Sequence, residues 1–456
     1  MKTPIENVEA IRAAMPREGL FAEKDWLISP TAFPLENEFV DELEKLGYRL
    51  GLFVRACNLL YQLSVRGKQP SWIADYLDRG KSPELIEFSR AQKFRDDLPR
   101  VLRPDLVLTE SSPNSSQKNG AKKNAQFSFT IAELDNVPGG IGLTAWLNRV
   151  YAALGQDVIG GANGMIEGFR AILPDGADII VSEEAATYRP EMEWLVHQLN
   201  NGSGEKKWRV ADAANSNCKS LDAKTVYRFF ELFDLANVPC ASSLMNAALN
   251  DGVRITPPFK PYLEEKMWFA LFWLRPLRNF WRRELSERHF LKLQQVIPYT
   301  WIVDPAPLPQ HAVVPQLEIN DWRELGKFSQ KQRDLILKIS GFSELAWGSR
   351  GVSLAADMPH HEWAAAVENA LRQFASNPYI LQRFHKGRLV EHPYFDPQKN
   401  VMRTMQGRVR LCPYYFRING KTELRGALAT VCPADKKLLH GMRDAILVPA
   451  ATAVDF

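Results

Sequence analysis

Two acidic clusters, one beside an arginine and one beside a pair of glycines, are the part of this sequence best suited to chemistry. The first contains Arg103 and Asp105, and the second contains Glu133 and Asp135, followed by Pro-Gly-Gly at 138–140. Each cluster lies in a short run in which polar and apolar residues alternate, which is the pattern of a strand. Because side chains two apart on a strand point to one face, Glu133 and Asp135 are expected side by side.

The chemistry that these residue types favour is the binding of a metal ion and a phosphate. If the two runs pair as neighbouring strands, Asp105 joins the other two carboxylates, with Arg103 beside them. Clustered carboxylates repel each other unless a cation lies between them, and Mg²⁺ carrying a nucleotide phosphate is the usual cation. The glycines at 139–140 would let backbone amides approach a ligand.

A structural interpretation of the same residues stays open. Arg103 and Asp105 could form a surface ion pair, and Glu133 and Asp135 could be the polar face of a strand. For any one of these residues alone, the structural interpretation is the stronger one. Because charged residues are depleted from strands, the cluster as a whole supports a metal–phosphate site equally well.

Composition and charge limit the class of protein. The chain has 456 residues, of which 45% are hydrophobic and 24% are charged, so it is long enough for two or three lobes with large cores. A formal net charge of +4 is small for this length and argues against a dedicated nucleic-acid-binding protein. The five cysteines are scattered without a CxxC motif, which predicts free thiols in a reducing cytoplasm.

We expect neither secretion nor insertion into a membrane. The N-terminus alternates in charge and lacks the apolar core of a signal peptide. The longest apolar run, 267–274, is far too short to span a bilayer. These features predict a cytoplasmic protein with no membrane partner.

Apolar periodicity gives a coarse plan of the chain. Helices are predicted over 35–100, 141–170, 191–199 and 262–295, and strands over 177–181, 226–230, 334–339, 378–384 and 409–417. Between 175 and 245, short strands alternate with amphipathic helices, and a further strand is expected near 238–240, which is typical of βαβ units and a small parallel sheet. A low-complexity stretch over 110–120 predicts a mobile hairpin loop.

Several common catalytic motifs are missing from the sequence. No GxGxxG motif opens the βαβ region, and no P-loop, GxSxG or HExxH motif occurs, which disfavours a dinucleotide site, a P-loop NTPase, a serine hydrolase and a zinc enzyme. Two lysines are of interest. Lys338 lies inside an apolar strand run and is expected to have a function, whereas Lys266 follows two glutamates and could equally lie on a solvated helix face.

The order of these motifs resembles that of the circularly permuted ATP-grasp family, in particular the synthetase domain of glutathionylspermidine synthetases. The shared order is an Arg-x-Asp, a strand with Glu-x-Asn or Glu-x-Asp, a helix with a lysine, a strand with a lysine and a strand with a glutamine. The roles that the resemblance implies are catalytic for Arg103, metal-ligating for Asp105, Glu133 and Asp135, and ATP-binding for Lys266, Lys338, Gln382, Gly348, Arg350 and Gly351.

The resemblance also implies a fold class and a division of the chain. The expected class is α+β or α/β, a circularly permuted ATP-grasp with a small βαβ, Rossmann-like substrate lobe. On this plan 1–100 is a mainly helical N-terminal region and 101–175 is the metal-binding part of the core. Residues 176–245 form the small α/β lobe, and 246–456 form the nucleotide-binding lobe with the remainder of the core.

The activity that the resemblance implies is that of an ATP- and Mg²⁺-dependent ligase. Such an enzyme joins a small-molecule carboxylate to a small-molecule amine through an acylphosphate. The glycine-containing loop at 341–351 resembles a phosphate lid that would exclude water. Its apolar residues Phe342, Leu345 and Trp347 could instead fix it as a plain surface loop.

The chain departs from the family pattern, and this leaves other functions open. Asp135 stands where the synthetase has asparagine, the glycine loop is longer, no separate amidase domain is present, and 188–191 has no counterpart. One alternative is a noncatalytic or regulatory nucleotide-binding relative that acts as an interaction protein. A second is another sugar- or phosphate-handling α/β enzyme with Asp-x-Asp-like metal ligation.

Overall fold

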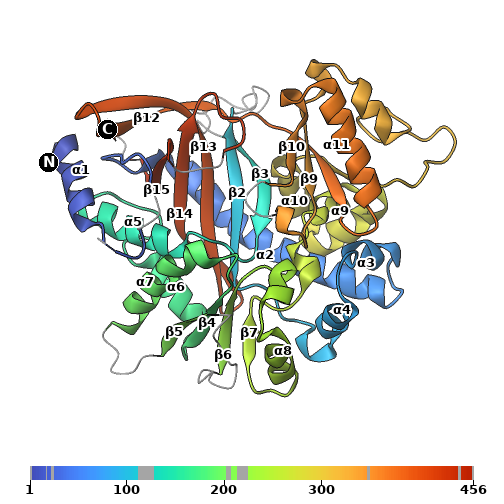
Figure 1. Cartoon of the computed structure of the whole chain (residues 1–456), viewed down its shortest axis with the longest axis horizontal. Coiled ribbons are helices and arrows are strands. Elements are labelled where there is room, and N and C mark those ends of the chain that lie inside the picture. The colour runs from blue at the N-terminus through green and yellow to red at the C-terminus, as the bar shows by residue number, and fades with distance from the viewer. Residues whose placement is uncertain are drawn as a thin grey trace.

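The computed structural model has a mixed α+β fold built on three sheets (Figure 1). The residues that it describes are 3–16, 18–21, 25–110, 128–201, 207–212, 224–346, 350–439 and 443–453. Most of the predicted hairpin loop at 110–120 therefore lies outside the described residues, as do Trp347 and Gly348. Among the helices of these ranges, none combines the length and the hydropathy needed to cross a membrane.

The largest sheet joins strands from the N-terminal third of the chain to strands from its C-terminal part. Its order is β1-β15-β14-β13-β2-β3, and β12 pairs with β13 outside this path. The strands are β1 (Phe33–Leu35), β2 (Val101–Thr109), β3 (Ser128–Asp135), β12 (Leu389–Asp396), β13 (Val401–Ile418), β14 (Lys421–Pro433) and β15 (Ile446–Thr452). The strands predicted around the two acidic clusters are confirmed as β2 and β3, and they pair antiparallel.

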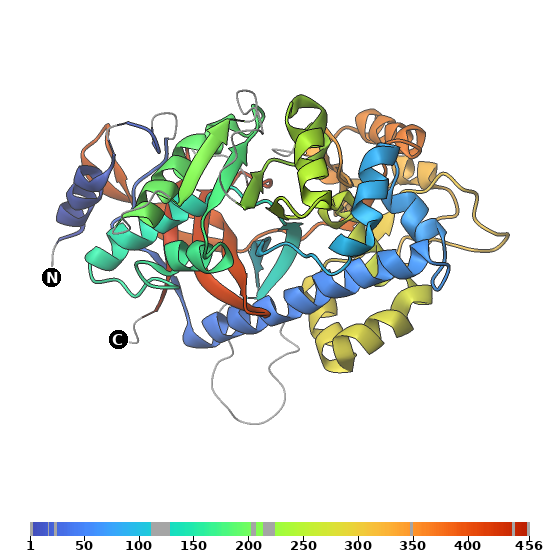
Figure 2. The same cartoon turned by 90° about the horizontal axis from the view of Figure 1, so that it is seen from below.

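Helices cover both faces of this large sheet. The long helix α2 (Asn37–Val65) lies against one face of the sheet at Gly47 and Gly51. A Cβ built on Gly47 would come within 2.5 Å of the Tyr415 ring. On the other face, α5 (Ile141–Ala153) and α6 (Gly164–Ile172) pack, and Gly168 lies against Phe416. Figure 2 shows α2 running along the molecule from the large sheet toward the helices α3 (Trp72–Leu77) and α4 (Pro83–Arg90).

The second sheet is a small parallel one, as the βαβ pattern predicts. Its order is β5-β4-β6-β7, and every neighbouring pair is parallel. The elements are β4 (Ala177–Val181), α7 (Arg189–Asn200), β5 (Trp208–Asp212), β6 (Thr225–Phe229), α8 (Ala241–Leu249) and β7 (Arg254–Thr256). The strand expected near 238–240 is wrong, because this segment is a turn between the 3₁₀ helix Leu232–Asn237 and α8.

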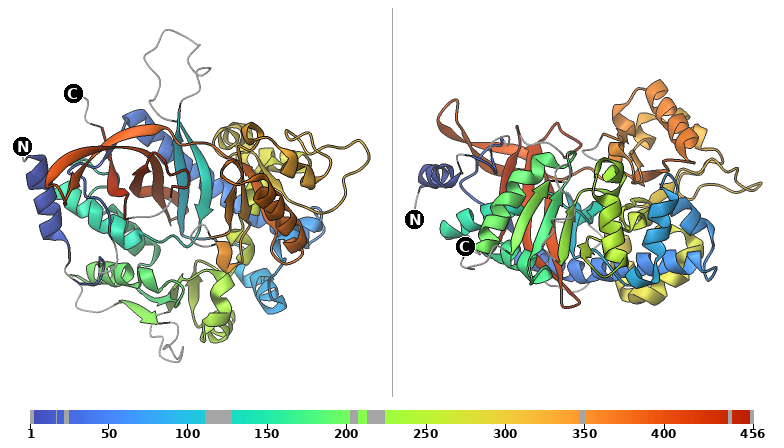
Figure 3. Two further views of the ribbon diagram at one scale, coloured as in Figure 1. Left: turned by 45° about the horizontal axis from the view of Figure 1, so that its top comes forward. Right: turned by 60° about the horizontal axis from the view of Figure 1, so that its bottom comes forward.

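The third sheet is antiparallel and has its own apolar core. Its strands are β8 (Thr300–Ile302), β9 (Leu335–Ile339), β10 (Val352–Leu354) and β11 (Tyr379–Arg383), in the order β10-β9-β11-β8. Helix α11 (His360–Gln373) packs on this sheet through the buried Trp363 (Figure 3). On β9, Leu335, Leu337 and Ile339 face this core, so that Lys338 points to the opposite face.

The remaining helices are α1 (Pro4–Ala14), α9 (Met267–Trp273) and α10 (Arg278–Val296). The last two fall in the predicted helical range 262–295, whereas apolar periodicity did not predict α1. The predicted range 246–456 is divided among all three sheets, because β7 belongs to the second sheet, β8 to β11 build the third, and β12 to β15 belong to the large one. Of the five cysteines, Cys57, Cys240, Cys412 and Cys432 carry free thiols, and Cys218 lies outside the described residues.

The segment 188–191 connects the small α/β lobe to the glycine pair that follows β3. The fully buried Glu191 accepts hydrogen bonds from the amides of Gly140 at 2.7 Å and Leu143 at 3.1 Å, at the N-terminus of α5. A carboxylate there satisfies two helix-end amides and complements the helix dipole. The Tyr188 ring lies over Gly139, where a Cβ would come within 2.3 Å of it. The Gly140 amide is therefore already hydrogen-bonded to a side chain of the protein, Glu191.

Replacing this carboxylate is expected to weaken the junction of the two lobes. Glu191→Leu leaves two helix-end amides without this acceptor, each worth about 1–3 kcal/mol, so the free energy of unfolding should fall by about 2–6 kcal/mol. Glu191→Gln keeps one acceptor oxygen and should lose roughly half as much. Urea unfolding followed by fluorescence measures both. A Glu191→Leu variant as stable as the parent protein would contradict this role of Glu191.

Candidate functional site

Arg103 holds the two acidic clusters together, because it lies between Asp105 of the first and Asp135 of the second. In the pairing of β2 with β3, Arg103 is opposite Asp135, and Asp105 is opposite Glu133. The Arg103 guanidinium lies 3.1 Å from Asp105 Oδ1 and 3.0 Å from Asp135 Oδ2, and it donates to the Gly139 carbonyl at 3.0 Å. Burial alone would lower the pKa of Arg103, but the two carboxylates outweigh it and raise that pKa. The arginine is therefore a fixed positive charge.

Asp135, the residue that replaces the asparagine of the family pattern, is partly neutralised by its surroundings. Burial raises its pKa to about 6, although Arg103 and the Val137 amide, which donates to Asp135 Oδ1 at 2.8 Å, act in the opposite direction. Glu133 and Asp105 add to the increase. The three carboxylates can lie this close together because one of them, Asp135, can hold a proton.

Glu133 pairs with the first of the two candidate ATP-binding lysines. Lys266 Nζ lies 2.9 Å from Glu133 Oε1. Burial would lower the pKa of Lys266, and the charge of Glu133 outweighs this and raises it. Lys266 therefore faces the acidic cluster. Its side chain is only 12% exposed, which excludes the alternative that it lies on a solvated helix face.

Two further residues at Asp105 come from the C-terminal strand β13, and sequence reasoning missed them. Arg410 Nη1 lies 3.3 Å from Asp105 Oδ2, and Cys412 Sγ lies 3.4 Å from Asp105 Oδ1. Burial raises the pKa of the Cys412 thiol to about 12, so it stays protonated. The available signal was the alternation of polar residues at 408, 410 and 412 in the predicted strand over 409–417, which puts them on one face.

The three predicted metal ligands are neighbours, but each is paired with a cation of the protein. Asp105 and Asp135 are bound by Arg103, and Glu133 by Lys266. Within the described ranges, no three acidic, histidine or cysteine side chains are arranged to hold a metal ion. Carboxylate oxygens are the ligand type that Mg²⁺ prefers, but in the arrangement described Mg²⁺ would have to displace Lys266 from Glu133.

A second group of polar residues lies on the third sheet, facing this cluster. Lys338 Nζ donates to the Ala132 carbonyl at 2.8 Å and to Gln382 Oε1 at 2.9 Å, and Gln382 Nε2 donates to Thr300 Oγ1 at 3.2 Å. These contacts explain why a lysine and a glutamine occur in buried strands. Burial lowers the pKa of Lys338 to about 8. The amine is thus poised to exchange a proton near neutral pH.

The two polar groups line opposite walls of one cavity. Its volume is about 790 Å³, including the open solvent at its mouth. Asp105, Glu133 and Arg410 lie on the wall formed by the large sheet, and Lys338 and Gln382 on the wall formed by β9 and β11. The remaining lining residues are Val107, Thr130, Ala132, Pro298, Ile336, Val352, Arg383, Phe384, His385, Lys437, Leu438 and Leu439.

The described part of the glycine-containing loop lies between the third sheet and the small α/β lobe. Arg350 pairs with Glu184, which lies in the segment after β4. Gly351 lies close to the backbone, since a Cβ there would come within 2.7 Å of the Leu345 carbonyl oxygen. The predicted ATP-binding residue Gly348 is outside the described residues, and the roles of Arg350 and Gly351 at phosphate stay predictions.

The fold of the whole chain is similar to that of a solved protein. The apo structure of a glutathione synthetase-like effector from Globodera pallida matches with a TM-score of 0.55, covering 99% of this chain and 98% of that chain at 11% sequence identity. At this identity the likeness concerns the fold alone, which is mixed α+β and glutathione synthetase-like. No protein-family model and no curated protein matches the sequence.

Proposed function

We propose that this chain is an ATP-dependent ligase of the circularly permuted ATP-grasp type, which joins a carboxylate to an amine. The observation that carries the proposal is the cavity between the large sheet and the third sheet. One of its walls offers Lys338 and Gln382, and the other offers the carboxylates of Asp105 and Glu133. A nucleotide needs an apolar slot for its base and charged groups for its phosphates, and this cavity combines Ile336 and other apolar residues with both kinds of charge.

Each charged residue has a role in this proposal that its position suggests. Lys266 and Lys338 bind phosphate oxygens as point charges, since Lys338 lines the cavity and Lys266 pairs with Glu133, a lining residue. Arg103 stabilises the charge on the phosphoryl group during transfer. Asp105, Glu133 and Asp135 are the residues that would hold Mg²⁺, which would supply positive charge to neutralise phosphate.

The reaction proposed is a transfer in two steps. The substrate carboxylate attacks the γ-phosphorus of ATP, ADP leaves, and an acylphosphate forms. The amine then attacks the acyl carbon, phosphate leaves, and the amine nitrogen loses a proton to form the amide. The protein contributes mainly positioning and positive charge, which is why a site with two lysines and an arginine but no activated nucleophile suits it.

Removing the charge of Glu133 is expected to abolish Mg²⁺-dependent nucleotide binding. Glu133→Gln keeps the shape of the side chain but weakens its metal ligation, so the Kd for Mg·ATP should rise at least tenfold while the thermal unfolding midpoint is retained. Isothermal titration calorimetry measures the affinity. Glu391→Gln makes the same change on an exposed residue of β12 and should bind as the parent does. An unchanged Mg·ATP affinity in Glu133→Gln would remove this site from consideration.

Nucleotide affinity is also expected to depend on the proton of Lys338. With a pKa of about 8 in the free protein, the amine is charged below pH 8 and neutral above it. Phosphate binding needs the charged form, so affinity should be constant below pH 8 and fall by up to about tenfold per pH unit above it. Lys338→Arg keeps the charge at every pH used and should flatten this dependence. Equal pH dependence of the parent and Lys338→Arg between pH 7 and pH 9.5 would contradict the assignment.

A noncatalytic nucleotide-binding relative is the second candidate, and one observation favours it. Arg103 and Lys266 already neutralise the three carboxylates that would hold Mg²⁺. ADP release with Mg·ATP and pooled amino acids, peptides and polyamines distinguishes the two. Release that depends on an added carboxylate supports the ligase, and nucleotide binding without release supports the noncatalytic relative.

A further inference from the structure

Lys81, in the turn between α3 and α4, forms an ion pair with Glu265 that is almost completely buried. Lys81 Nζ lies 2.5 Å from Glu265 Oε1, and the two side chains are 1% and 3% exposed. Burying two charges carries a large desolvation penalty, and apolar residues of similar size would often stabilise a fold as well. A pair of this kind therefore calls for an explanation beyond stability.

Glu265 connects the lysine-bearing segments of the proposed ATP site. Its second oxygen accepts a hydrogen bond from the hydroxyl of Ser340. That hydroxyl accepts the Met267 amide at 2.9 Å, and the Ser340 carbonyl accepts the Lys266 amide at 2.8 Å. Lys266 directly follows Glu265, and Ser340 is two residues beyond Lys338. The backbones that carry both lysines are thus joined at one point.

The neighbours of this ion pair restrict the start of the glycine-containing loop. Lys81 Nζ lies 5.1 Å from the centre of the Phe342 ring. A Cβ built on Gly341 would come within 2.8 Å of the Glu264 carbonyl oxygen and 3.1 Å of Glu265 Cδ, so this loop residue lies directly on the Glu265 segment. The loop therefore begins from a fixed point.

The turn that presents Lys81 is itself fixed to the rest of the molecule. Gly80 has φ +73°, and a Cβ there would come within 2.1 Å of the Ser376 carbonyl oxygen, which lies just after α11. Arg79 donates to the Phe374 carbonyl at 3.0 Å. The helices α3 and α4 thus lie beside the third-sheet lobe, as Figure 3 shows.

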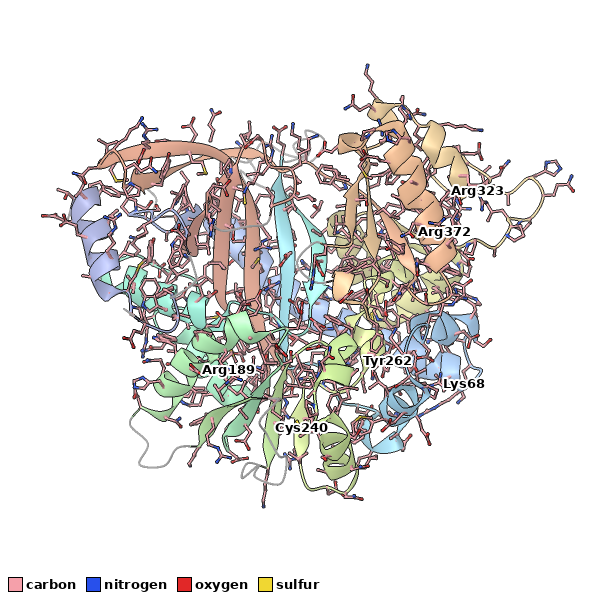
Figure 4. All side chains as sticks on the ribbon, viewed as in Figure 1. Lys68, Arg189, Cys240, Tyr262, Arg323 and Arg372 are labelled. Atoms are coloured by element: carbon pink, nitrogen blue, oxygen red, sulfur yellow. The ribbon has the colours of Figure 1, made fainter. Side chains whose placement is uncertain are left out.

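The Glu265 segment is anchored at its other end to α2. The Tyr262 ring, labelled in Figure 4, stacks on Tyr61 with centroids 3.7 Å apart, and its hydroxyl donates to Asn58 Oδ1 at 2.8 Å. Lys260 Nζ donates to the same Asn58 oxygen at 2.9 Å. Residues 260–265 are therefore held rigidly between the N-terminal helices and β9.

We propose that Lys81 and Glu265 are positioning residues, which set the separation of Lys266 and Lys338 and the origin of the loop at 341–351. This inference rests on the proposed function, because it gives the two lysines their task of binding one triphosphate. Neither Lys81 nor Glu265 is proposed to touch the nucleotide. Their charges make a directional contact, through Ser340, that an apolar pair cannot make.

The test uses a double variant that removes the charges and keeps the packing. Lys81→Met combined with Glu265→Leu replaces a buried ion pair by apolar side chains, so its thermal unfolding midpoint should stay close to that of the parent. Amide hydrogen exchange at 342–346, without ligand, should accelerate at least tenfold because the link to Ser340 is lost. The Kd for Mg·ATP should rise at least tenfold. The pair Arg49→Met and Glu42→Leu, which removes an ion pair within α2, is the control and should leave both readouts unchanged.

Two outcomes would overturn the positioning role. One is a double variant of parental stability whose exchange at 342–346 is also parental. The other applies if the double variant fails to fold. Ser340→Ala keeps the Lys81–Glu265 pair and removes the hydroxyl that joins Glu265 to the Met267 amide, and this variant then shows no faster exchange at 342–346. Absence of Mg·ATP binding by the parent protein would contradict the proposed function instead, while the exchange measurement still decides the role of the ion pair.

Discussion

The antiparallel pairing of β2 with β3 is the constraint on which the rest of the site depends. It sets Arg103 opposite Asp135 and Asp105 opposite Glu133, with a bulge immediately after Asp105. A shift of the register by one residue would turn these side chains to the opposite face of the sheet. Three carboxylates this close would repel each other, and the guanidinium between two of them makes the arrangement possible. Lys266 and Arg410 complete the neutralisation from other parts of the chain.

Charge balance also explains how the site could respond to a ligand. In the described state the protein's own cations occupy the carboxylates, so the cluster is stable without a metal ion. Lys338 lines the cavity, and Lys266 is paired with Glu133, which also lines it, so a triphosphate bound there would add negative charge near both amines. The phosphates would attract both amines, and Glu133 would then be available to Mg²⁺. Exchange of ion-pair partners of this type needs only side-chain movement.

Local patterns in the sequence predicted the strands and the residue types of the site, because both depend on neighbours along the chain. Alternation gave β2 and β3, apolar runs gave β9 and β11, and the lysine inside the apolar run of β9 was expected to have a function. The partners that neutralise the cluster could not be found in this way. Arg410 meets Asp105 across 305 positions, and Lys81 meets Glu265 across 184 positions, so both contacts arise only from the topology. The strands β1, β5, β7, β8, β10, β12, β14 and β15 were not predicted, and the supposed strand near 238–240 has the apolar character of a buried turn.

A crystal structure of the protein with Mg²⁺ and a nonhydrolysable ATP analogue is the most direct test of the central proposal. The base is predicted to lie in the cavity between β11 and the large sheet, beside Gln382. The triphosphate should be within hydrogen-bond distance of the amines of Lys266 and Lys338, and Mg²⁺ should contact Glu133. Density for the analogue at any other place would contradict the proposal, and so would an empty cavity at millimolar analogue with Lys266 still paired to Glu133.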